Sequence, residues 1–332
     1  MTQQPLQPLS QETPYENLSP ETVMTAVEAL CGRCTGAIFA LNSYENRVYD
    51  VTLDDGSHVI AKFYRPYRWP KAAILEEHAF TNELAALEIP VVAPLAFDGE
   101  TLFEHADYLY ALYPKRGGRP FEVRSDDDLR MMGRLLGRLH NVGAQAQFEH
   151  RPALSVKAFG WDNLVYLRQA GVIPADLLSA YDATATQLLH QLDEIWAGRT
   201  YGLRLHGDCH LGNILFDKEP FLVDLDDCLS GPAVQDMWML VSGDREELSH
   251  QMGTLLEGYQ QLRDFDYSEL RLVEVLRSLR MMNYAAWLAR RWNDPTFPKN
   301  FPFFATQQFW ENHVLSLKEQ LSVLAEPILV AV

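Results

Sequence analysis

The stretch His206-Gly207-Asp208-Cys209-His210-Leu211-Gly212-Asn213 is followed shortly afterwards by Val223-Asp224-Leu225-Asp226. If Asp208 and Asn213 stand at the two ends of one short loop, both side chains can point to the same place. Residues 221–223 read as a short buried strand that delivers Asp224 beside them. The plain alternative is a surface loop before an apolar strand, because Asp and Asn are common loop residues.

Two carboxylates and a carboxamide in this order are the parts that phosphoryl transfer from ATP requires. A reacting phosphate carries charge that a metal must neutralise, and the incoming hydroxyl needs a proton acceptor. In the protein-kinase pattern an Asp accepts that proton, an Asn five positions later holds magnesium, and a following Asp also binds metal. Asp208, Asn213 and Asp224 match these roles, so the sequence predicts a site for ATP and Mg²⁺ with Asp208 and Asp224 as its catalytic carboxylates.

A lysine for the phosphates is expected on a strand upstream, with a glutamate on the next helix to hold it. Lys62 in Val59-Ile60-Ala61-Lys62 meets the first requirement, although a solvated strand lysine is the alternative. Glu77 meets the second. The adjacent Glu76 remains a rival, since neighbouring positions on a helix cannot be told apart without the fold.

The loop that covers the triphosphate contains no glycine here. Leu41-Asn42-Ser43-Tyr44-Glu45-Asn46-Arg47 has neither the Gly-x-Gly nor the Walker pattern. A turn of Asn and Ser can still offer backbone donors, and Ser43 adds a hydroxyl, so residues 42–46 are the candidate loop. An ordinary polar turn is the alternative. By position alone, residues 112–115 are the candidate adenine segment, or a simple linker.

Charge and composition exclude several classes of function. The 332 residues carry 28 Lys and Arg against 45 Asp and Glu, a net charge of −17, which argues against nucleic acid and an anionic membrane surface as partners. No basic start and apolar run mark a secretory signal, and no segment reaches membrane-spanning length. We expect a cytoplasmic monomer. Cys31 and Cys34 have metal or redox spacing, but no second paired motif accompanies them.

The chain changes character near Pro114, which predicts an α+β, two-lobed, protein-kinase-like fold. Residues 1–18 read as a flexible leader, residues 19–114 as a small β-rich N-lobe that binds nucleotide, and residues 115–332 as a larger helical C-lobe with the catalytic, metal and acceptor sites. Helices are expected near residues 19–30, 72–87, 129–140, 176–195 and 269–292. Strands are expected at 47–53, 59–63, 89–94 and 108–112, the first two joined by a turn at Asp54-Asp55-Gly56.

Three further features bear on regulation and on the acceptor. Gly207 stands where many regulated protein kinases carry an arginine, so activation by loop phosphorylation is not expected. Asp236 is interpreted as a brace for the catalytic loop. Residues 290–302 combine cationic, aromatic and turn residues that could line the acceptor side, or could end helices and fill the core.

These strings resemble a known family. Residues 206–213 with Val223-Asp224-Leu225-Asp226 are similar to the aminoglycoside phosphotransferase and choline kinase superfamily. Residues 41–49, Lys62-Phe63-Tyr64-Arg65-Pro66, residues 205–213, 223–227 and 290–302 more narrowly resemble the bacterial stress response kinase A family. The similarity spans roughly residues 19–327.

The resemblance implies a cytoplasmic, ATP- and magnesium-dependent kinase that phosphorylates serine or threonine on proteins, including itself, during stress. It implies Asp208 as proton acceptor, Asn213 and Asp224 as magnesium ligands, and Ser43 at the ATP site. The protein substrates are not identified by the sequence. Two alternatives stay open: a small-molecule kinase acting on an amino alcohol or a sugar, and an ATP-binding scaffold with vestigial activity.

Overall fold

The structure is a computed structural model that describes residues 13–332. Most of the predicted leader, residues 1–18, therefore lies outside the described residues. The first helix, α1 (Pro20–Cys31), begins at the predicted proline, whose missing N–H costs nothing in the first turn of a helix. Val23, Ala26 and Val27 form its buried face.

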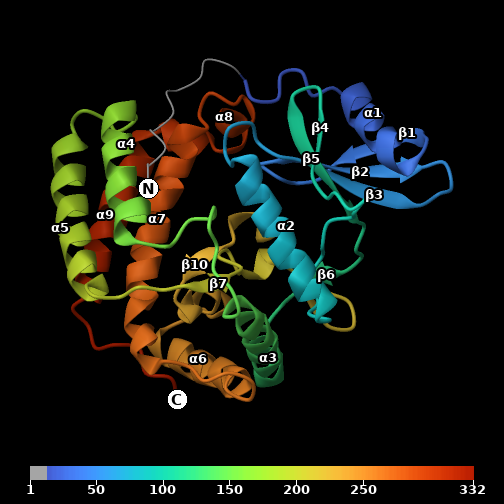
Figure 1. Ribbon diagram of the computed structural model, residues 1–332. Helices are drawn as coiled ribbons and strands as arrows, with labels where there is room; N and C mark the ends of the chain where they lie inside the picture. The colour runs from blue at the N-terminus through green and yellow to red at the C-terminus, as the bar shows by residue number, and fades with distance from the viewer. Residues whose placement is uncertain (1–12) are drawn as a thin grey trace. The chain divides into compact units, whose positions relative to one another are not determined.

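Five antiparallel strands in the order β1-β2-β3-β5-β4 follow α1 (Figure 1). The turn predicted at Asp54-Asp55-Gly56 joins β2 to β3. Gly56 adopts a φ of +81°, a backbone conformation that residues with a side chain rarely adopt. β3 is the central strand of the five, and five of its six residues are buried or half-buried. The bounds are β1 (Cys34–Ala40), β2 (Arg47–Leu53), β3 (His58–Phe63), β4 (Phe103–His105) and β5 (Tyr108–Pro114).

The prediction of a strand at residues 89–94 is wrong. Only one isolated bridge forms there, between Val91 and Leu222, because Pro90 and Pro94 have no N–H to donate to a ladder. The backbone of residues 90–92 nevertheless lies along β9, since Leu222 N donates to Pro90 O at 2.9 Å.

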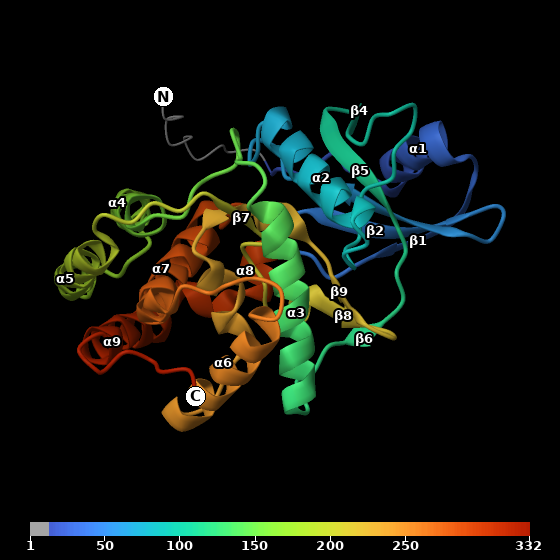
Figure 2. The same cartoon turned by 60° about the horizontal axis from the view of Figure 1, so that its bottom comes forward.

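Helices account for most of the rest of the chain (Figures 1 and 2), and the predicted helices are present with ends shifted by a few residues. The helices are α2 (Lys71–Ala86), α3 (Asp126–Gly143), α4 (Asp162–Ala170), α5 (Leu178–Trp196), α6 (Arg245–Tyr259), α7 (Val273–Arg290), α8 (Thr296–Asn300) and α9 (Gln307–Val323). The strands β6 (Arg119–Pro120), β8 (Ile214–Phe216) and β9 (Pro220–Leu222) form a second small sheet, and β7 (Leu203–Leu205) pairs with β10 (Leu229–Gly231).

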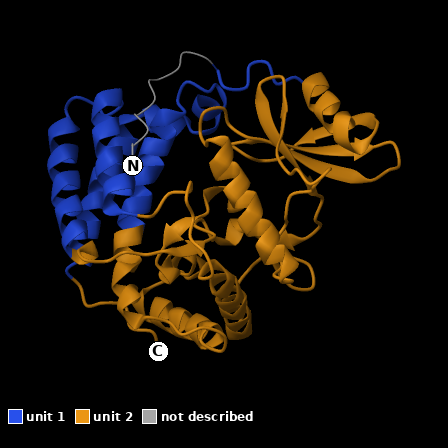
Figure 3. Cartoon of the chain, in the orientation of Figure 1, with its two compact units in different colours: residues 1–19, 155–194, 277–325 blue, residues 20–154, 195–276, 326–332 orange. Residues whose placement is uncertain are grey.

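The chain divides into two compact units (Figure 3). Unit 2 comprises residues 20–154, 195–276 and 326–332, and so contains the five-stranded sheet and the segments 206–213 and 223–226. Of the described residues, unit 1 comprises residues 13–19, 155–194 and 277–325. The lobe boundary at residue 114 stays a prediction.

Two glycines allow α3 and α6 of unit 2 to cross at backbone contact. A Cβ built on Gly133 of α3 would lie 2.0 Å from Leu255 O, and one on Gly258 of α6 would lie 2.1 Å from Arg130 O. No side chain fits at such distances, so the two helices depend on glycine to approach each other.

We predict that Gly133→Ala destabilises the protein by about 2 kcal/mol, because the added methyl group meets backbone rather than a movable side chain. That loss outweighs the gain of about 1 kcal/mol that alanine usually brings to a helix. Urea unfolding followed by circular dichroism measures the change. Gly117→Ala is the control, since nothing lies within 4 Å of a Cβ there; a Gly133→Ala protein as stable as this control would contradict the packing argument.

Candidate active site

The catalytic-loop candidate follows β7 and ends in a single 3₁₀ turn, Leu211–Asn213. Gly207 has a φ of +86°, and a Cβ on it would lie 2.3 Å from Asp227 O. Glycine at this position is therefore required by the path of the backbone, which explains why no arginine stands before Asp208.

The buried carboxylate of Asp236 fixes the start of this loop, as its interpretation as a brace predicts. Asp236 accepts hydrogen bonds from His206 N and Gly207 N, each at 2.8 Å. His140 Nε2 of α3 lies 3.2 Å from Asp236 Oδ2, and the hydroxyl of Tyr259 on α6 lies 2.9 Å from His140 Nδ1. These side chains are buried, so the crossing of α3 and α6 sets the position of residues 206–207 through hydrogen bonds that water does not weaken.

The 3₁₀ turn that carries Asp236 is itself anchored by a buried acid. Val234 N donates to Glu269 Oε2 at 3.0 Å. Glu269 is only 8% exposed, and burial raises its pKa to about 7.

Asp208 and Asn213 do lie together, as the spacing predicts. Asn213 Nδ2 donates to the backbone O of Asp208 at 3.0 Å and lies 3.5 Å from its Oδ2. His210 Nε2 lies 3.4 Å from the same carboxylate oxygen. The Asp208 side chain is 26% exposed, so an acceptor hydroxyl can reach it.

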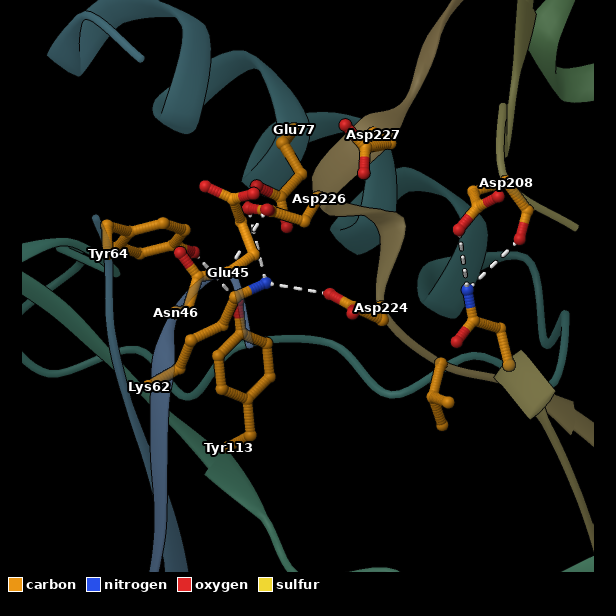
Figure 4. A network of polar contacts seen from close by, with 12 residues as sticks. Glu45, Asn46, Lys62, Tyr64, Glu77, Tyr113, Asp208, Asp224, Asp226 and Asp227 are labelled. Atoms are coloured by element: carbon orange, nitrogen blue, oxygen red, sulfur yellow. Dashed lines mark hydrogen bonds and ion pairs between the residues drawn. The ribbon is translucent and has the colours of Figure 1, made fainter. Parts of the chain in front are cut away.

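Lys62 and Asp224 form the second pair. Lys62 Nζ lies 3.0 Å from Asp224 Oδ1, and Figure 4 shows Asp224 in that view between Lys62 and Asp208. A backbone hydrogen bond joins the two pairs, because Val223 N donates to Asn213 O at 3.0 Å. Asp224 has a φ of +61°, a conformation that costs energy for a residue other than glycine and that residues at functional sites often adopt.

The Lys62 ammonium is buried among acids. Its Nζ also lies 3.3 Å from Asp226 Oδ1. Burial by itself lowers the pKa of Lys62, but the carboxylates of Asp224, Asp226 and Glu77 raise it well above its ordinary value. Lys62 is therefore charged at every physiological pH, as a phosphate ligand must be.

The structure separates the roles of Glu76 and Glu77. Glu76 accepts hydrogen bonds from the backbone N–H groups of residues 149–151, at 2.6 to 2.9 Å, and so anchors that segment. Glu77 is buried beside Lys62 and acts on its pKa. The ion pairs that the described residues form with Lys62 are those of Asp224 and Asp226, so the pairing of Lys62 with Glu77 stays a prediction.

The candidate phosphate loop, residues 42–46, leads directly into β2. Ser43 is half-buried, and among the residues that the structure describes it has no hydrogen bond to Lys62, Glu77 or Asp224. Asn46 points inward instead: its Nδ2 donates to Asp226 Oδ2 at 3.1 Å, and its Oδ1 accepts from Arg65 N at 3.1 Å. Arg65 also donates to the carbonyls of residues 44 and 45 and so fixes the loop backbone.

Sequence reasoning assigned no role to three members of this group, namely Asp226, which stands in the quoted motif, Arg68 and Arg151. Arg68 donates to the carboxylates of Asp226 and Asp227, and Arg151 donates to the backbone O of Asp226. The repeated acids of residues 224–227 were a signal that buried cations would be needed nearby. Nothing in the spacing indicated which arginines would supply them.

Other candidate groups remain separate. Cys31 and Cys34 carry free thiols, and burial raises the pKa of both. Within residues 13–332, no group of three or more His, Cys, Asp and Glu side chains could hold a metal by itself. In unit 1, Phe297 of the segment 290–302 is buried in the core, as the alternative interpretation of that segment predicts.

Comparisons with known proteins identify the family. The phosphotransferase enzyme family matches residues 38–273. Stress response kinase A of Salmonella choleraesuis is 43% identical over 313 residues, which cover 94% of this chain and 95% of the relative. The serine/threonine protein kinase RdoA of Salmonella typhimurium is 42% identical with the same coverage.

The chain belongs to the stress response kinase A family. It is a kinase, and its fold is the two-lobed α+β kinase-like fold that the sequence predicts. Amicoumacin kinase, solved with AMP-PNP and Ca²⁺, has a TM-score of 0.73 at 20% identity, covering 93% of this chain and 94% of that one. A microcompartment-associated aminopropanol kinase has a TM-score of 0.66 at 18% identity, covering 92% and 98%. In the described part of this kinase, no helix has the length and apolar character needed to span a membrane.

We predict that Glu269 makes the stability of this kinase depend on pH. Its pKa is about 7 when folded and near 4.5 when unfolded, so its contribution is complete below pH 4.5 and is lost as the pH rises through 7. The difference corresponds to roughly 3 kcal/mol. Glu269→Gln keeps an acceptor for Val234 N but cannot ionise, and should flatten the unfolding free energy between pH 5 and 8 relative to wild type.

Glu104→Gln is the control for this measurement, because Glu104 is exposed on β4. Urea titrations at half-unit pH steps give the slopes. An unchanged slope in Glu269→Gln would show that another group titrates.

Proposed function

We propose that this kinase transfers the γ-phosphoryl group of ATP, with Mg²⁺, to serine or threonine hydroxyls of proteins, including its own. The observation that carries the proposal is the pair of contacts Lys62–Asp224 and Asn213–Asp208, joined through Val223 N and Asn213 O. These contacts put a phosphate-binding cation, two oxygen ligands and a proton acceptor in one connected group.

Each residue has a distinct part in the proposed reaction. The Asp208 carboxylate orients the acceptor hydroxyl and takes its proton as the oxygen bonds to the γ-phosphorus and the bond to the bridging oxygen of ADP breaks. Lys62 neutralises charge on the α and β phosphates, and Asn213 and Asp224 bind metal. Asp236 holds residues 206–207 in place, so that Asp208 need not be ordered when substrate binds.

The donor set fits magnesium. Asn213 and Asp224 offer a carboxamide oxygen and a carboxylate, and the Asp224 side chain is 52% exposed. Mg²⁺ is usually held by one or two protein oxygens with the remaining positions filled by phosphate and water, so these two side chains are enough for such a site. Bound there, the ion would supply the positive charge that the transferring phosphoryl group requires.

Strand register supports a place for the nucleotide base. Ile60 pairs with Tyr113 and Lys62 with Ala111, so these four residues share one face of the sheet. Figure 4 shows Tyr113 beside Lys62. We place adenine along Ile60 and the end of β5, with residues 42–46 and Ser43 over the triphosphate.

The proposal that the phosphoryl acceptor is a protein rests on the names of the relatives. A relative that is 42% identical bears the name serine/threonine protein kinase, whereas the amicoumacin kinase and the aminopropanol kinase are 20% and 18% identical. A small-molecule acceptor is the second candidate, because the fold neighbours act on such compounds by name and a net charge of −17 favours a cationic acceptor. We further propose a cytoplasmic monomer with no nucleic-acid partner.

We predict that Asp208→Asn lowers kcat by about 10²- to 10⁴-fold, because the amide cannot accept the hydroxyl proton. The affinity for a fluorescent ATP analogue should change less than threefold. The control is Asp217→Asn, which alters an exposed aspartate in the β8–β9 turn. Turnover within a factor of three of wild type in Asp208→Asn would refute the assignment of Asp208.

The acceptor class can be decided in one labelling experiment. Radiolabelled ATP is incubated with the kinase alone, with casein-type protein, and with a panel of amino alcohols and sugars; Asp208→Asn is the blank. We expect label on serine or threonine, including residues of the kinase itself. Label found only in a metabolite would establish the small-molecule kinase, and ADP release no greater than in metal-free buffer would establish the scaffold.

A further inference from the structure

We propose that Asp226, rather than Glu77, is the residue that positions Lys62 for the nucleotide phosphates. The inference rests on the proposed function, because it gives a role to a residue around the same nucleotide. Asp226 would be a positioning residue: it touches Lys62 and leaves the reacting atoms to Asp208, Asn213 and Asp224.

Three segments of the small lobe meet at the Asp226 carboxylate. Its Oδ1 lies 3.3 Å from Lys62 Nζ of β3. Its Oδ2 accepts from Asn46 Nδ2 of the candidate phosphate loop at 3.1 Å, and from Arg68 of the segment between β3 and α2. Asp226 is 2% exposed, so these interactions are shielded from water and are stronger than surface ion pairs.

The backbone around Asp226 is held as firmly as its side chain. Arg151 Nε donates to Cys228 O at 2.9 Å, and its Nη2 donates to Asp226 O. The guanidinium of Arg151 also lies over the ring of Trp69, 4.0 Å from its centre. A carboxylate on so constrained a backbone can define where a lysine points.

Glu77 is a poorer anchor in this structure. Glu77 Oε2 and Asp226 Oδ1 are both buried without a hydrogen-bond partner among the described residues. What favours Asp226 is its ion pair with Lys62 at 3.3 Å and the bonds that its Oδ2 accepts from Asn46 and Arg68.

The arrangement divides two tasks between neighbouring acids. Asp224 is half exposed and can exchange Lys62 for a metal ion when nucleotide arrives. Asp226 is enclosed by cations and can retain Lys62 during that exchange. The ammonium would then stay aimed at the phosphates while Asp224 turns to the metal.

A double-mutant cycle tests the proposal on nucleotide affinity, which needs no catalysis. The probe is a fluorescent ATP analogue with Mg²⁺, and KM and kcat for ATP are measured alongside. We expect Asp226→Asn to weaken binding and raise KM about tenfold with a smaller change in kcat, and Glu77→Gln to change both less than threefold. In a Lys62→Met background, Asp226→Asn should have no further effect on affinity, because the residue acts only through Lys62.

Asp227→Asn is the matched control, since Asp227 is the adjacent acid and contacts Arg68 without contacting Lys62; it should bind nucleotide within threefold of wild type. Asp226→Glu is the second variant if Asp226→Asn does not fold. It keeps the charge but moves the carboxylate from its position beside Lys62, and should raise KM about threefold in an otherwise wild-type chain and not at all beside Lys62→Met.

Several outcomes would overturn the proposal. The first is a larger effect of Glu77→Gln than of Asp226→Asn. The second is an effect of Asp226→Asn or Asp226→Glu that persists beside Lys62→Met. The third is an affinity in Asp226→Asn that high Mg²⁺ restores, which would make Asp226 a metal ligand. Measurements on the wild type distinguish a failure of the proposed function from a failure of the role given to Asp226. A wild type that binds nucleotide without releasing ADP contradicts the proposed function alone. A wild type that binds no nucleotide contradicts both the function and the role of Asp226.

Discussion

The burial of one ammonium group, that of Lys62, organises the nucleotide half of this site. An unpaired charge in a protein interior costs several kcal/mol, so the lysine requires carboxylates within contact distance. Asp224 and Asp226 meet that need from a segment far away in the chain, at 3.0 and 3.3 Å. Because two carboxylates now lie close together, Arg68 and Arg151 are needed to balance them. The ion pairs thus join β3 to residues 224–226, and the contacts of the two arginines follow from them.

The catalytic half depends on hydrogen bonds to backbone. Asp236 uses both carboxylate oxygens to hold consecutive N–H groups of the loop before Asp208, and His140 and Tyr259 hold Asp236. The last two side chains come from α3 and α6, which cross where glycine permits backbone contact. The precision of the loop therefore depends on helix packing well away from the reacting atoms.

Sequence could predict the parts of the site that lie on one local pattern. Asp208 and Asn213 are joined by a single loop, so their spacing already indicated contact, and Lys62 stood in an apolar strand before a helix. Contacts between distant segments could not be predicted this way. Whether Glu76 or Glu77 lies beside Lys62 depended on the path of residues 149–151, since their backbone N–H groups donate to the carboxylate of Glu76.

Prolines explain the main error about the fold. Residues 89–94 have the apolar composition of a strand, but two prolines remove the donors that a ladder needs. The inward direction of the Asn46 side chain could not be predicted from the sequence either, because a polar residue in a turn usually faces solvent. Its partner, Asp226, comes 180 positions later in the chain.

The most direct test is an experimental structure of the kinase with a non-hydrolysable ATP analogue and Mg²⁺. The account predicts Lys62 Nζ within hydrogen-bonding distance of the α or β phosphate, metal on Asn213 and Asp224, and the Asp208 carboxylate facing the γ-phosphate. A nucleotide bound away from Lys62, or a metal ion that contacts neither Asn213 nor Asp224, would contradict it.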